Sequence, residues 1–256
     1  MVTSDGKRLH GEGPTTKYVA HRYLYSYIRV IFCILFYRAL TCTRWAELSE
    51  SLRFHLKLAQ EGMLPSEFRL LNGAAPVLVG VSSSIDSEAQ SLSQGTVSNL
   101  TRLLAAFEES PSGQTPLCWH IRDVIKHIEP IASKLRLAGQ KIAIIIATDG
   151  EPTDGDLVET LRPLQQLPVW LIIRLCTDDE RIVAFWNNVD TQLELDMDVI
   201  DDLFRESEGI SAVNSWLTYS EPLHRLREFG ITVKEFDLLD ESTLTGDQIR
   251  SVAAML

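Results

Sequence analysis

The chain has 256 residues, of which 45% are hydrophobic and 23% are charged, which argues against global disorder and is typical of a globular protein. Its formal net charge of −11 argues against a nucleic-acid-binding surface. The four cysteines are scattered and form no C-x-x-C pair, which argues against a disulfide scaffold or a structural zinc site. We therefore expect a cytoplasmic globular protein that does not bind nucleic acid.

The N-terminal region is expected to be a loose tail, residues 1–29, followed by one α/β domain, residues 30–256. The stretch "VIFCILFY", Val30–Tyr37, predicts a first strand because it is rich in β-branched and aromatic residues. It is too short to span a membrane, and arginines flank it. A membrane anchor and an altered exon covering residues 1–40 are the two alternatives.

Further along the chain, helical periodicity alternates with short apolar runs. Helices are predicted near residues 44–61, 97–107, 117–135, 157–167, 180–188, 199–207 and 221–229, and from 246 onward. Strands are predicted in a hairpin around Asn72-Gly73 and at residues 141–147, 169–176 and 231–239. The run "KIAIIIA" is apolar on both faces, which favours a central parallel strand. The alternation predicts a mostly parallel sheet covered by helices on both faces.

The stretch "IIIATDGEPTDGD", Ile144–Asp156, passes from a buried strand into an acidic loop. Ligands of open α/β sheets lie beyond the carboxyl ends of the strands, which is where Asp149 is expected. A carboxylate there needs a partner, and a hard cation with oxygen ligands would provide one. The alternative for Asp149 is a helix cap or a turn former.

Three stretches resemble von Willebrand factor A domains: "TDGEPTD" after an apolar strand, "GQTPL" before a long helix, and "TRWAELSESLRFHLKLAQEG" followed by "FRLLNG". The resemblance implies a doubly wound, mostly parallel sheet with one antiparallel edge strand and helices on both faces. It also implies a metal-ion-dependent adhesion site, to which Asp149 and Thr115 would contribute ligands. For Thr115, a helix N-cap is the alternative.

The resembling family places a D-x-S-x-S element after its first strand, and this chain departs from that pattern. Leu35, Tyr37 and Ala39 stand roughly where the Asp and the two Ser residues belong. Thr115 and Asp149 alone offer too few oxygens for Mg²⁺, which demands near-octahedral coordination. We therefore expect Mg²⁺ binding to be weak or absent.

The chain carries no P-loop, no G-x-G-x-x-G, no H-E-x-x-H and no complete nucleophile elbow, so an enzyme is not expected. The favoured hypothesis is a module that binds a protein partner and carries a degenerate metal site. One alternative is a metal-assisted hydrolase that uses Asp149, Asp154 and Asp156. Another is a metal-free acidic scaffold, because residues 178–208 hold eleven acidic residues and only two arginines.

Overall fold

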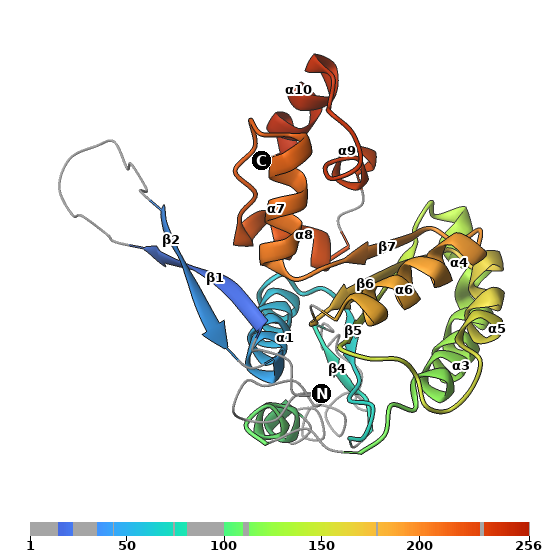
Figure 1. Ribbon diagram of the computed structural model, residues 1–256. Helices are drawn as coiled ribbons and strands as arrows, with labels where there is room; N and C mark the ends of the chain where they lie inside the picture. The colour runs from blue at the N-terminus through green and yellow to red at the C-terminus, as the bar shows by residue number, and fades with distance from the viewer. Residues whose placement is uncertain are drawn as a thin grey trace.

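The computed structural model describes residues 15–22, 35–42, 44–73, 75–80, 100–109, 113–177, 179–230 and 233–255. It is an α/β structure with a three-stranded parallel sheet, two antiparallel strand pairs and surrounding helices (Figure 1). The predicted α/β class is thereby confirmed, while the complete doubly wound sheet stays a prediction. Across these described ranges, no helix has both the length and the apolar composition that a membrane span requires.

The strands are β1 (Thr15–Arg22), β2 (Leu35–Cys42), β3 (Ser66–Phe68), β4 (Val77–Val79), β5 (Ile142–Thr148), β6 (Val169–Leu175) and β7 (Met197–Ile200). The helices are α1 (Arg44–Glu61), α3 (Leu117–Ile128), α4 (Ala132–Leu137), α5 (Leu157–Leu161), α6 (Glu180–Gln192), α7 (Leu203–Val213), α8 (Glu221–Glu228), α9 (Lys234–Asp237) and α10 (Gly246–Met255). Two 3-10 helices, η1 (Glu129–Ile131) and η2 (Arg162–Gln166), follow α3 and α5, and residues 100–106 are also helical.

The parallel sheet has the order β5-β6-β7, and the main core lies between it and helices α3, α5 and α6. Leu171 and Ile173 of β6 face this core, whereas Ile172 lies against Gly230, directly after α8. Helices therefore lie on both faces of β6. The run predicted as the central strand is β5, but among the described strands it pairs with β6 alone, and its Ile145 is 38% exposed. The central place belongs to β6, which is almost completely buried.

The N-terminal region contains the antiparallel pair β1–β2, in which Thr15 lies opposite Cys42. Figure 1 shows this pair extending away from the parallel sheet. The predicted first strand, Val30–Tyr37, overlaps β2 only at its last three residues, and residues 30–34 lie outside the described ranges. The range 1–29, expected to be a loose tail, contains β1. The boundary between tail and domain stays a prediction.

Helix α1 covers the predicted range and leads into the predicted hairpin, β3–β4. After the helix the Leu64 N–H donates to the Ala59 carbonyl at 2.9 Å, and Met63 takes the left-handed conformation with φ 49°. Gly80 follows β4 with φ 71°, and a Cβ there would lie 2.1 Å from the Leu64 carbonyl oxygen. Only glycine fits this close approach, which holds the hairpin against the end of α1.

Of two predictions for the C-terminal third, the first has the wrong bounds and the second is wrong. Residues 199–207 were expected to be helical, but the structure has β7 up to Ile200 and then α7 from Leu203. Residues 231–239 were expected to form a strand, but Lys234–Asp237 form α9, and residues 231–232 lie outside the described ranges. Helices α7, α9 and α10 instead enclose a second core with Tyr219. The prediction of a last helix from residue 246 is confirmed.

Candidate functional site

Asp149 lies directly after β5, at the carboxyl end of the parallel sheet, and pairs with Arg44 at the start of α1. Arg44 Nη1 is 3.7 Å from Asp149 Oδ2, and the two side chains are only 6% and 10% exposed. Burial lowers the pKa of Arg44, and the negative charge of Asp149 opposes that shift. The structure thus provides a cation for Asp149, and it is a guanidinium group of the chain itself.

Thr115 lies in the loop before α3 and contacts the acidic loop after β5. Its backbone N–H donates to Thr153 Oγ1 at 3.0 Å, and the Thr153 N–H donates to the Thr115 carbonyl at 2.9 Å. The two loops that were predicted to form one site therefore lie together, joined through Thr153. The helix N-cap position belongs to Pro116, so the alternative of Thr115 as the N-cap is wrong.

Asp154, in the acidic loop after β5, caps the N-terminus of α3. Its carboxylate accepts the N–H groups of Cys118 at 2.9 Å and Trp119 at 2.7 Å, two of the helix donors that lack an intrahelical partner. Partial burial raises the pKa of Asp154, but these two hydrogen bonds outweigh it, so the pKa lies below its ordinary value. Asp154 therefore fixes the orientation of α3 relative to the acidic loop.

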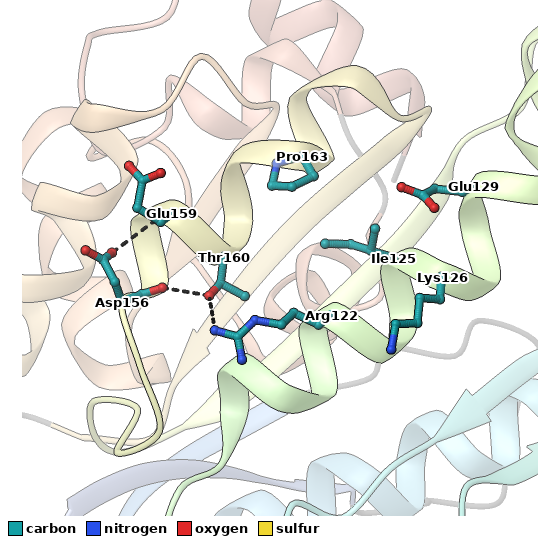
Figure 2. A pocket seen from close by; sticks show the side chains of 8 residues that line it. All are labelled: Arg122, Ile125, Lys126, Glu129, Asp156, Glu159, Thr160 and Pro163. Carbon is teal, nitrogen blue, oxygen red and sulfur yellow. Dashed lines mark hydrogen bonds between the residues drawn. The ribbon is translucent and has the colours of Figure 1, made fainter.

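Asp156 is the N-cap of α5, where its side chain accepts the Glu159 N–H at 3.1 Å (Figure 2). Each of the three carboxylates proposed for a hydrolase thus has a protein donor: Arg44 for Asp149, two α3 amides for Asp154, and an α5 amide for Asp156. Within the described ranges, no group of three His, Cys, Asp or Glu side chains is arranged to hold a metal ion. This donor set does not fit a divalent cation.

Replacing Asp154 with alanine is expected to lower the free energy of unfolding by about 1–2 kcal/mol, because two helix N–H groups lose their acceptor. Chemical denaturation measures this change. Glu151→Ala is the matched control, since Glu151 lies in the same loop with an exposed side chain. An equal loss in both variants would show that Asp154 does not act as a cap.

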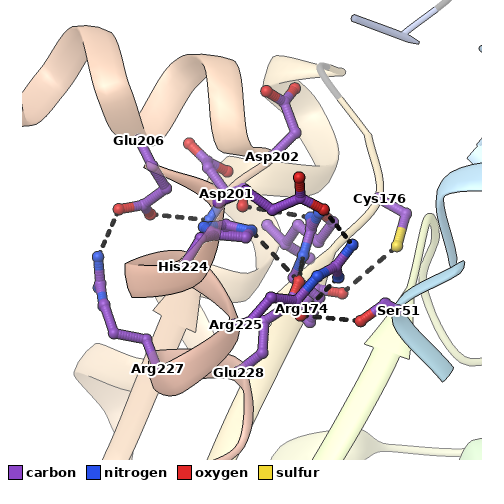
Figure 3. Close-up of polar contacts among 12 residues, drawn as sticks. Ser51, Arg174, Cys176, Asp201, Asp202, Glu206, His224, Arg225, Arg227 and Glu228 are labelled. Atoms are coloured by element: carbon purple, nitrogen blue, oxygen red, sulfur yellow. Dashed lines mark hydrogen bonds and ion pairs between the residues drawn. The ribbon is translucent and has the colours of Figure 1, made fainter. Parts of the chain in front are cut away.

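A buried ion cluster, which the sequence analysis did not find, surrounds Glu228 of α8 on the other face of the sheet (Figure 3). Its carboxylate is contacted by Ser51 Oγ at 2.8 Å, Arg174 Nε at 2.5 Å, Arg225 Nη1 at 2.7 Å, His224 Nε2 at 3.2 Å and His55 Nε2 at 3.4 Å. Burial raises the pKa of Glu228, but the charge of Arg174 and the other contacts hold it well below its ordinary value. The cluster ties α1, β6 and α8 together.

A second buried cluster centres on Arg227, the residue before Glu228. Arg227 donates from Nη1 to Glu206 at 2.6 Å and from Nη2 to Asp198 at 3.3 Å. Tyr219 joins the two clusters, since its hydroxyl lies 3.1 Å from His224 Nδ1 and accepts from Arg227 Nη1 at 3.4 Å. Burial raises the pKa of Glu206 to about 7, against the effect of Arg227. One signal in the sequence indicated the Glu228 cluster: Arg174 interrupts the apolar strand "VWLIIRLC".

The acidic residues between 178 and 208 make many contacts within the chain. Asp179 and Asp202 are N-caps of α6 and α7, Asp196 pairs with Lys141, and Asp198 and Glu206 pair with Arg227. These side chains therefore stabilise the fold, which weakens the case for this segment as an acidic docking surface.

No protein-family model matches the chain. No curated protein matches it, and no solved structure does. The function is therefore inferred from the contacts around Asp149, Thr115 and α3 themselves.

Proposed function

We propose that the chain is a protein-binding module that resembles a von Willebrand factor A domain, and that Arg44 takes the place of the divalent cation beside Asp149. The observation that carries this proposal is the ion pair of these two residues at the carboxyl end of β5. A carboxylate removed from water needs a counter-charge, and a guanidinium fixed on α1 supplies it. On this proposal the chain shares with that family the doubly wound sheet and the binding surface at the carboxyl ends of its strands, while its metal binding is weak or absent.

The loops around this pair support a role in binding, because they are held in one arrangement. Thr115 is joined to Thr153, and Asp154 is joined to the first turn of α3. The indole Nε1 of Trp186 also donates to the Gly150 carbonyl at 3.3 Å. A surface that is ordered before binding loses less conformational entropy when a partner docks.

Titration with Mg²⁺, Mn²⁺ and Ca²⁺ tests the part of the proposal that concerns the metal. We expect no binding heat at millimolar metal from the wild-type chain, because Arg44 already neutralises Asp149. The Asp149→Ala variant is the control for heat that arises elsewhere. Heat that the wild type gives and Asp149→Ala loses would contradict the proposal and establish a metal site.

A double-mutant cycle tests the ion pair itself. Arg44→Gln and Asp149→Asn are each expected to destabilise the fold, and the double variant by less than their sum, with a coupling of about 1 kcal/mol or more. The matched control is the exposed pair of Lys57 and Glu61, for which the coupling is expected to be about 0.5 kcal/mol or less. Equal coupling energies in the two cycles would contradict the proposal that Arg44 neutralises Asp149 in place of a metal ion.

The hydrolase alternative makes a different prediction. Turnover of an ester or phosphoester panel that is lost in Asp149→Asn would favour that alternative over a binding module. The contacts of Asp154 and Asp156 with helix amides argue against it, because an acceptor that caps a helix is a poor metal ligand or base.

A further inference from the structure

We draw no further inference here: the strongest candidate, the edge of β5 opposite β6, where Ile145 is 38% exposed and no second strand pairs within the described part of the chain, carries none because nothing in the structure shows what covers it.

Discussion

Replacing Glu228 with glutamine is expected to lower the free energy of unfolding by about 3–5 kcal/mol, because the buried guanidinium of Arg174 loses the Glu228 carboxylate and Arg225 keeps only its pair with Glu221. Glutamine keeps the volume and one acceptor oxygen, so the loss reports charge and not a cavity. Arg174 and Arg225 approach the carboxylate at 2.5 Å and 2.7 Å, and Arg174, whose side chain is 3% exposed, cannot move into water without opening the core. Urea denaturation followed by circular dichroism measures the change.

Two variants make this result interpretable. Glu159→Gln removes an exposed ion pair with Arg162 and is expected to change stability by about 0.5 kcal/mol or less. Arg174→Met/Glu228→Gln removes a buried cation together with the anion, and its loss is expected to be smaller than the sum of the single variants. A loss below about 1 kcal/mol in Glu228→Gln would mean that the cluster contributes little to the fold.

Elements that depend on local pattern were predictable from the sequence. Helix α1 has periodic apolar residues over its whole length, and the structure begins and ends it where the periodicity does. The runs that form β5 and β6 are apolar and bounded by polar loops, so their strand state was predictable too. Their positions in the sheet were not, because strand order depends on pairing between distant segments.

The errors in the C-terminal third have a physical reason. Strand β7 has four residues, and its sequence "MDVI" is too short to distinguish an extended segment from the start of a helix. Helix α9 also has four residues, "KEFD", inside a stretch whose alternating pattern resembles a strand. Tertiary packing around the second core decides both segments, and no local window contains that information.

The sequence indicated that Asp149 requires a positively charged partner, but it did not indicate which group supplies the charge. The position of Asp149 after a buried strand indicated a carboxylate that requires a cation. The structure supplies Arg44, which is far away in the sequence and which no motif marked as the partner of Asp149. Asp154 was considered only for the hydrolase alternative, yet it accepts N–H groups at the start of α3, which precedes the acidic loop in the chain.

The two buried clusters differ in charge balance. Around Glu228, Arg174 and Arg225 contact the carboxylate, Arg225 also pairs with Glu221, and the pKa of the Glu228 carboxyl is held well below its ordinary value. Around Arg227, two carboxylates share one guanidinium, and burial raises the pKa of Glu206 to about 7. Burial is the main cause of this raised pKa, and the charges of Asp240 and Asp198 add to it, against the effect of Arg227.

The raised pKa of Glu206 predicts a pH dependence that Glu206→Gln removes. A carboxyl whose pKa is higher in the folded chain binds its proton more tightly there, so the free energy of unfolding falls as pH rises from about 4.5 to about 7. The stability of the wild type relative to Glu206→Gln is therefore expected to fall by about 2–3 kcal/mol across this window. Urea denaturation of both chains at a series of pH values measures the difference.

Other groups titrate in the same window, and the difference between the two chains removes most of their effect. Burial lowers the pKa of His224 to about 4, so its contribution is lost as pH falls from about 6.5, and that loss occurs in both chains. Ile210→Val is the control, because it weakens α7 by about 1 kcal/mol without changing a titrating group, so its profile should parallel the wild type. A stability of the wild type, relative to Glu206→Gln, that rises with pH would contradict this prediction. It would mean that Arg227 keeps Glu206 ionised in the folded chain.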